Sequence, residues 1–301
     1  MLCFKLFRVC CVQQPYHILG NQLAGFRSLQ TVKMALRENQ IKENHHQIMH
    51  QNVIVMRHGD RIDNFDPLWT STAARPWDPP LAQQGQDRAF QMGKSIQQSL
   101  GFPIHRLFVS PFLRCIQTSA KFVISLSAVN NVRENVISDS IQNDPSNVKV
   151  SIEYGLCEMI NSIAIRLNVA PKDGNFSFDI SELEAMLPAR NVDNNVEMVY
   201  KELPMWEESV LQARARYQHT IEKLADKFPT ENLLFITHGE GIEVALSSFR
   251  KDVVVNKVQY CGYVQLSRPI FQRDHSLIGG KFNVLTHSGQ SGVTFNPSQG
   301  H

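Results

Sequence analysis

The strongest pattern in the chain is a set of short, continuous apolar runs, each followed at once by charged or polar residues. Such runs are typical of strands that are covered on both faces of a parallel sheet. The three best runs lie at residues 53–56, 106–109 and 233–237, and two later candidates lie at 264–266 and 282–285. The intervals between the first three runs are long enough to hold helical connections.

Amphipathic segments lie between these runs and predict helices. Apolar residues recur at steps of three and four over residues 83–100 and, most regularly, over 207–228. Ser110 and Pro111 favour an N-cap and a first turn, which would open a further helix to about residue 126. The alternation of strands and helices predicts an α/β fold.

The remaining segments divide the chain into parts. Residues 1–50 contain only basic charges up to Lys33, and we expect an N-terminal extension, disordered or targeting, without a role in the fold. Residues 51–287 then form the domain. Within it, residues 129–205 are less periodic and predict an inserted lid region. Residues 288–301 are rich in Gly, Ser and Gln and predict a flexible tail.

Composition excludes several classes of protein. The chain has 301 residues, 43% of them hydrophobic, and a formal charge of +2, which argues against a broad basic surface for nucleic acid. No uncharged apolar run approaches the roughly 20 residues that span a bilayer. Six cysteines without CxxC or zinc spacing indicate a reducing compartment. We expect a cytoplasmic protein without a membrane partner, or an organellar one if residues 1–50 act as a transit peptide.

Chemically unusual residues follow three of the predicted strands. Arg57, His58 and Arg61 follow the first, Arg114 follows the second, and His238 follows the third. Ligands of open α/β sheets bind outside the carboxyl ends of the strands, so these side chains are expected to converge. Two histidines and three arginines at one point predict a site for a phosphoryl group, because guanidinium groups match phosphate oxygens in bidentate pairs.

The histidines suggest a reaction at that site. A neutral imidazole can attack phosphorus and form a phosphohistidine, while the arginines stabilise charge on the phosphoryl oxygens. A carboxylic acid is still needed to protonate the departing oxygen and later to activate water. From the residues alone, geometry must choose this acid.

Three motifs resemble one known superfamily. RHGDR (57–61), SPFLRCIQTS (110–119) and THGEG (237–241) are similar, in this order, to the histidine phosphatases, also called phosphoglycerate mutase-like proteins. Within them, RIDNFDPLW and ARPWDPPL resemble the phosphatase domain of the ubiquitin-associated and SH3-domain-containing phosphatases and their stand-alone plant relatives. The resemblance implies a three-layer α/β/α sandwich with a mostly parallel central sheet, and no cofactor or metal.

The resemblance also implies roles for residues. His58 would be the nucleophile, with Arg57, Arg61, Arg114 and His238 around the phosphate. Glu158 matches the position of the proton donor, which would leave Glu153 as a supporting residue. Asp60 lies beside the cluster and could serve as the acid instead, but from its position we expect it to orient an arginine. Ile62–Asp63 and His238–Gly239 stand where the acid-phosphatase branch has Pro and a His-Asp pair, and this departure argues against that branch.

Three functions are compatible with these residues. The first is a metal-independent phosphomonoester hydrolase that works through a phosphohistidine on His58. The second is a phosphoglycerate-mutase-type phosphotransferase, which begins with the same intermediate. The third is a phosphate- or phosphoprotein-binding module with vestigial activity. The expected partner is a phosphorylated small molecule or a phosphoprotein, and the sequence leaves a homodimer open.

Overall fold

The computed structural model describes residues 46–130 and 147–298, with side chains from 49 to 126 and from 147 to 298. The chain divides into two units, Met1–His46 and Gln47–His301. Residues 1–45 of the predicted extension lie outside the described residues. Among the described helices, none is long and apolar enough to cross a bilayer.

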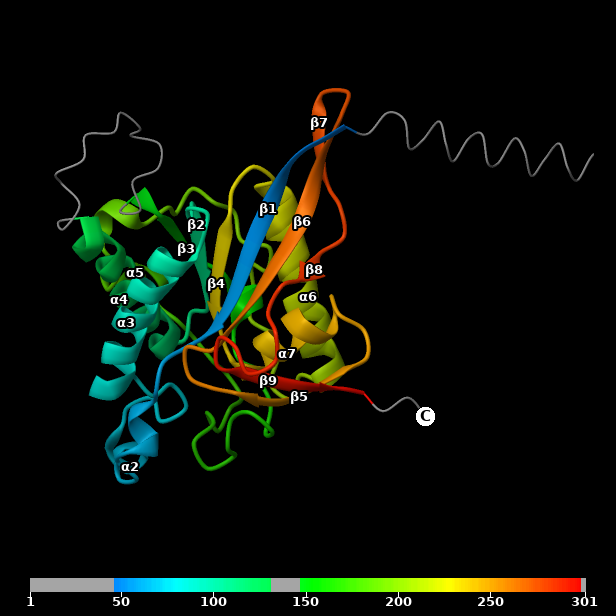
Figure 1. The fold of residues 1–301 in the computed structure, drawn as a ribbon. Helices are drawn as coiled ribbons and strands as arrows, with labels where there is room; N and C mark the ends of the chain where they lie inside the picture. Colours follow the sequence, from blue (N-terminus) through cyan, green and yellow to red (C-terminus); the bar gives the residue numbers. More distant parts are fainter. Residues whose placement is uncertain (1–45, 131–146, 299–301) are drawn as a thin grey trace, which may run out of the picture. The chain divides into compact units, whose positions relative to one another are not determined.

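A sheet of seven described strands forms the centre of the second unit, in the order β3-β2-β4-β1-β6-β7 with β8 paired to β6 (Figure 1). The strands are β1 (His46–Arg57), β2 (Arg106–Val109), β3 (Lys149–Ile152), β4 (Leu233–Thr237), β6 (Tyr263–Arg273), β7 (Ser276–Gly279) and β8 (Asn283–Val284). The pairs of β1 with β4, β2 with β4 and β2 with β3 are parallel, whereas β7 and β8 pair antiparallel with β6. The prediction of a mostly parallel sheet is therefore confirmed.

Helices cover both faces of this sheet. They are α2 (Trp69–Thr72), α3 (Gln83–Ser99), α4 (Leu113–Asn130), α5 (Ile180–Ala185), α6 (Val210–Lys227) and α7 (Gly239–Ser247), and the short 3-10 turns are η1 (Ile62–Asn64), η4 (Tyr154–Leu156) and η5 (Ala189–Asn191). In Figure 1, α3 and α4 lie on one side of the strands and α6 and α7 on the other. The start of α6 is fixed by a capping box between Ser209 and Gln212.

The alternation of side chains along β1 produces two cores. Val53 and Val55 belong to the buried cluster that includes α6 and α7, whereas Ile54 and Met56 belong to the one that includes α3 and α4. All four are fully buried. A sheet that is covered on both faces needs strands with apolar residues at successive positions. For this reason the strands could be predicted from continuous apolar runs in the sequence.

Part of the predicted lid belongs to the central sheet. Within residues 129–205, β3 pairs in parallel with β2, and its residues Val150 and Ile152 lie in the main core. Residues 131–146 lie outside the described residues. The prediction of a separate insertion over the whole range is wrong because β3 is only four residues long and starts with a polar lysine, so its periodicity is too weak to recognise.

The two ends of the domain also differ from expectation. β1 begins at His46 rather than after residue 50, and the polar Gln51 within it is buried because its amide donates to the Ala225, Phe228 and Glu231 carbonyls. At the other end, the predicted tail contains β9 (Val293–Pro297), which pairs antiparallel with β5 (Val253–Val258). Val293 and Phe295 anchor β9 by burial.

Candidate active site

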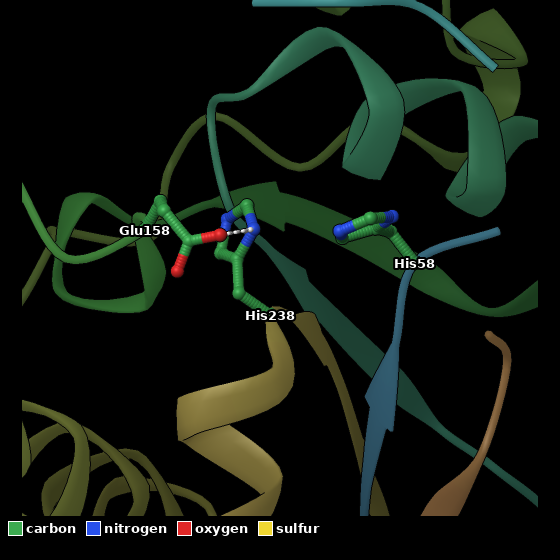
Figure 2. Close-up of side chains that lie close together, drawn as sticks. All are labelled: His58, Glu158 and His238. Atoms are coloured by element: carbon green, nitrogen blue, oxygen red, sulfur yellow. Dashed lines mark ion pairs between the residues drawn. The ribbon is translucent and has the colours of Figure 1, made fainter. Parts of the chain in front are cut away.

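The register of the sheet brings the three motifs to one edge. Arg57 pairs with Thr237 across β1 and β4, and Val109 pairs with Ile236 across β2 and β4, so the residues that follow these strands emerge together. His58 follows β1, and His238 is the N-cap of α7. The two imidazole rings lie with their centroids 5.3 Å apart (Figure 2). The predicted convergence of the two histidines is therefore present.

His58 is held with one ring nitrogen free to act. Its Nδ1 lies 2.7 Å from the Gly59 carbonyl, which fixes the proton on Nδ1 and leaves the lone pair on Nε2. The neighbouring Gly59 has no room for a side chain, since a Cβ there would lie 2.7 Å from the Gly85 carbonyl oxygen of α3. Burial, together with Arg114, His238 and Arg57, lowers the pKa of His58 well below its usual value. The imidazole is therefore neutral at neutral pH, as a nucleophile requires.

His238 is fully buried beside Glu158. Its Nδ1 lies 3.1 Å from Glu158 Oε2, and its Nε2 lies 2.8 Å from Ser110 Oγ. Both contacts are satisfied if the proton of the His238 ring is on Nδ1. Nδ1 then donates to the Glu158 carboxylate, and Nε2 accepts from the Ser110 hydroxyl. Burial lowers the pKa of His238 to about 4, against the opposite effect of Glu158.

Arg114 joins the separate parts of the site. Its side chain is 2% exposed, its Nε donates to His58 Nε2 at 3.2 Å, and its Nη2 donates to Glu158 Oε2 at 3.3 Å. On the other side, its Nη1 lies 3.7 Å from Asp78 Oδ1 and makes no hydrogen bond. A buried guanidinium with an unused donor is well suited to hold an incoming oxyanion.

Glu158 lies against both Arg114 and His238. Burial raises the pKa of its carboxyl, but His238 and Arg114 lower it by more, so the net pKa is below the ordinary value. Its second oxygen, Oε1, accepts from the Met159 amide at 3.2 Å. Glu158 is consequently an ionised carboxylate, which can accept a proton and can serve as an acid only once its pKa has been raised.

Arg57 and Arg61 lie in different environments. The Arg57 guanidinium donates to the Val258 carbonyl and stacks 4.1 Å from the centroid of the Tyr260 ring, while its Nε is buried without a partner. Arg61 donates through Nε to Asp63 Oδ1 at 2.9 Å and makes a second bond to the same carboxylate. Arg57 thus keeps a donor for a ligand, whereas Arg61 is held by Asp63.

The other two candidate acids are engaged elsewhere. Glu153 is 1% exposed, and its carboxylate accepts from the amides of Gly155, Val199 and Tyr200. Asp60 pairs with Arg88 of α3 at 2.7 Å. Asp60 therefore orients an arginine, as expected, but not one of the cluster around His58. Of the three carboxylates, Glu158 is the one that contacts Arg114 and His238.

Sequence reasoning missed Asp78, which is 3% exposed in the loop before α3. Its Oδ1 accepts from the Leu113 amide at 2.8 Å and so caps the start of α4. The predicted cap, Ser110, instead contacts His238, and α4 begins at Leu113. The sequence gives only a weak signal for Asp78. The residue lies 36 positions before Arg114, and the surrounding stretch WDPP indicates only a turn.

Tyr260 was missed for a similar reason. It lies between β5 and β6, and its ring is 5.6 Å from that of His58. Its hydroxyl accepts from Asn64 Nδ2 at 2.7 Å, and it provides the aromatic face under Arg57. No motif marks this position, and only the antiparallel return of β6 beside β1 brings it to the site.

His58, Glu158 and His238 also have the chemistry of metal ligands. One ligand atom from each lies within 4.8 Å of the others. Arg114 is in contact with all three, with its Nη2 only 3.2 Å from His238 Nδ1. A divalent cation among these ligands would meet the guanidinium charge at close range, so the site as folded fits an anion better than a metal ion.

Acidification is expected to destabilise the fold through these histidines. His238 has a pKa of about 4 when folded and about 6.5 when unfolded. Between these values the unfolded chain binds the extra proton, so stability is full above pH 6.5 and falls as the pH falls towards 4, by on the order of 3 kcal/mol for this group. His58 acts in the same direction.

Urea unfolding at several pH values between about 7.5 and 5 checks this expectation. His238→Asn should show a smaller loss on acidification than the wild type, whereas His219→Asn, at an exposed position, should follow the wild type. A free energy of unfolding that stays constant over this range would contradict the account of buried, neutral histidines.

Comparisons with known proteins give a partial match in sequence and longer matches in fold. No family model matches the chain. The chain is 30% identical to the 2,3-bisphosphoglycerate-dependent phosphoglycerate mutase of Chlamydia pneumoniae over 113 residues. This matched segment makes up 38% of this chain and 44% of the mutase. The match thus spans less than half the length of this relative.

Solved structures give longer matches at lower identity. The ecdysone phosphate phosphatase from Bombix mori, solved with tungstate, has a TM-score of 0.55 and 20% identity and covers 79% of this chain and 92% of its own. A phosphoglycerate mutase from Bacillus anthracis str. Sterne has a TM-score of 0.44 and 16% identity, and the match covers 77% of this chain and 92% of the mutase chain. The chain shares the fold of the ecdysone phosphate phosphatase, a mixed α/β fold with a mostly parallel central sheet.

Proposed function

We propose that this protein is a histidine phosphatase that hydrolyses phosphomonoesters through a phosphohistidine on His58, without a metal ion. The observation that carries the proposal is the contact of Arg114 Nε with His58 Nε2 at 3.2 Å. This contact places the buried guanidinium of Arg114 beside the lone pair of the neutral His58 imidazole. When that lone pair attacks phosphorus, the phosphoryl oxygens would lie next to the guanidinium.

In the first step, His58 Nε2 attacks phosphorus and the bond from phosphorus to the leaving oxygen breaks. The Nδ1 proton stays on the ring and is held by the Gly59 carbonyl. Arg57 and Arg114 each have a guanidinium nitrogen without a partner, and these donors would bind the equatorial oxygens. Arg61 would add a further positive charge, and the neutral His238 lies beside Glu158.

Glu158 supplies the proton for the leaving oxygen. His238 and Arg114 keep its pKa low. A phosphate dianion beside Arg114 offsets the positive charge and raises that pKa, so that Glu158 takes up a proton as the substrate binds. In the second step the carboxylate accepts a proton from water, which attacks phosphorus and returns the electron pair to His58.

Turnover of p-nitrophenyl phosphate by the purified protein tests the proposed activity. We expect release of p-nitrophenol that survives EDTA, because His58 itself is the nucleophile. Loss of turnover on chelation, restored by adding a divalent metal, would contradict the metal-independent mechanism. Absence of turnover with every phosphomonoester in a broad panel would favour a binding module.

Replacing Glu158 should have an effect that depends on the leaving group. Glu158→Gln cannot donate the proton, so kcat/KM should fall by about 10²–10⁴-fold for alkyl phosphates and far less for p-nitrophenyl phosphate, whose leaving oxygen needs little protonation. The measurement is kcat/KM over a series of phosphate esters of rising leaving-group pKa.

Asp60→Asn and Glu153→Gln are the matched controls for this series. Their carboxylates contact Arg88 and backbone amides respectively, so neither change should alter the dependence on the leaving group. If one of them steepened that dependence and Glu158→Gln did not, the acid would be that residue and the assignment of Glu158 would be wrong.

A phosphoglycerate mutase activity is the second candidate, and it is favoured by the match to the mutase of Chlamydia pneumoniae. Incubation with 3-phosphoglycerate separates the two, since a mutase exchanges isomers whereas a phosphatase releases free phosphate. Within the superfamily, we propose that the chain groups with the ubiquitin-associated and SH3-domain-containing phosphatases and their plant relatives, on the basis of RIDNFDPLW and ARPWDPPL.

A further inference from the structure

A second cavity lies away from the candidate active site, over α6, the end of α7 and the hairpin of β6 and β7. Its volume is about 550 Å³. The lining includes three basic side chains, Arg268, Lys251 and Lys281, two acidic ones, Glu222 and Asp226, and the glycine pair 279–280.

The antiparallel course of β6 beside β1 sets the distance between the two sites. The Arg57 amide donates to the Gly262 carbonyl at the end of β1 that leads to His58. Arg268 contacts Gln51, which lies six residues before Arg57 in the same strand. At about 3.3 Å for each residue of a strand, the cavity is roughly 20 Å from His58.

Arg268 is built into the wall of this cavity. The residue is 4% exposed, its Nε donates to Gln51 Oε1 at 2.8 Å, and its Nη1 donates to Asp226 Oδ1 at 2.7 Å. Its Nη2 is buried and has no hydrogen-bond partner among the described residues. Because an unsatisfied buried donor costs free energy, this nitrogen would gain from an acceptor oxygen that reaches it.

The position of the guanidinium is fixed by its neighbours. Its Cζ lies 4.7 Å from the centroid of the Phe282 ring. On the other side, a Cβ added to Gly279 would lie 2.3 Å from the same Cζ, so the guanidinium lies against a backbone that must be glycine. The arginine is thus held in place before any ligand arrives.

The charges around the cavity favour an anion. Lys251 and Lys281 are exposed on its rim, and neither forms an ion pair with a described carboxylate. Of the two acidic residues, Asp226 is bound by Arg268 and Glu222 accepts from Gln218. Two lysines and one guanidinium nitrogen are left to bind a ligand, and this set matches the oxygens of a phosphate group.

We propose that this cavity is a second anion site, which binds the phosphate group of a small molecule through Arg268, Lys251 and Lys281. The site is separate from the candidate active site and does not depend on the proposed function. Gln51 connects it to β1, the strand that ends at His58.

Titration of the full-length protein with inorganic phosphate, followed by ¹H–¹⁵N NMR, tests the proposal. The amide signals of Gly279 and Gly280 report the second site, and those of Gly59 and Gly239 report the candidate active site. Sodium chloride at matched ionic strength serves as the salt control. We expect a saturable shift at Gly279 and Gly280.

The double variant Lys251→Gln/Lys281→Gln should weaken that saturation by about tenfold or more, while Lys94→Gln, on α3 at the other face of the sheet, should leave it unchanged. Both lysines are exposed, so the double variant should fold. Shifts that are linear in phosphate, equal in the double variant, or confined to Gly59 and Gly239 would overturn the second site, and the last result would leave the proposed function intact.

Discussion

His58→Ala is expected to lower kcat/KM for p-nitrophenyl phosphate by at least about 10³-fold, with little change in stability relative to this loss. The imidazole supplies the lone pair that attacks phosphorus, and no other described nucleophile with a free lone pair contacts Arg114 Nε. His238 is not expected to replace it, because its Nε2 lone pair accepts from Ser110, whereas the Nε2 of His58 faces Arg114, the proposed phosphate ligand. Initial rates over a range of substrate concentrations give the measurement.

His219→Ala is the matched control for this loss. His219 is exposed on α6 beside Tyr200, so its removal should leave kcat/KM close to the wild-type value. Circular dichroism and a thermal melt show whether each variant is folded. A folded His58→Ala protein with wild-type turnover would exclude His58 as the nucleophile.

Arg114→Ala is expected to have the second-largest effect, and it should affect both activity and stability. Removal of a positioned donor to the phosphoryl oxygens should lower kcat by about 10²–10³-fold. The substitution also removes the Arg114 charge from Glu158 and from Asp78, which keeps Arg75 as a partner at 3.4 Å, so the loss of stability should stay below the roughly 3–5 kcal/mol of a fully broken buried ion pair. Steady-state kinetics and urea unfolding measure the two effects separately.

Arg114→Lys separates charge from geometry. A lysine keeps the positive charge, but it lacks the planar fork that contacts His58, Glu158 and Asp78 together. We expect this variant to recover part of the stability and little of the kcat. Arg88→Ala removes an arginine that pairs with Asp60 outside the cluster, and it should retain nearly full activity. Equal losses in Arg88→Ala and Arg114→Ala would indicate a general effect of lost charge.

The parts of the fold that could be predicted from the sequence are those with a periodic signal. β1, β2 and β4 are apolar at successive positions because both faces of the sheet are covered, and α6 is amphipathic over 18 residues. β3 was missed because it has four residues, and β9 was missed because Gly- and Ser-rich turns surround it. Short edge elements take their stability from pairing, which leaves little trace in local sequence.

A similar division applies to the candidate site. His58, Arg114 and His238 follow directly from strand ends or helix starts, so their convergence could be predicted from the topology of parallel sheets. Asp78 and Tyr260 come from loops, and only the folded backbone places them against Arg114 and Arg57. The family resemblance was the basis for choosing Glu158 over Glu153, which lies five positions away, and the contacts in the fold give an independent distinction, because Glu158 contacts Arg114 and His238 whereas Glu153 accepts from backbone amides.

The proposed function depends on a covalent phosphate on His58, and trapping that intermediate is its most direct test. The Glu158→Gln variant should be mixed with p-nitrophenyl phosphate, quenched at alkaline pH, digested and analysed by mass spectrometry. Because this variant cannot activate water, it should accumulate one phosphoryl group on the peptide that contains His58, and the adduct should be stable to base and labile to acid. Turnover of the same substrate without any adduct, or an adduct on another residue, would contradict the account.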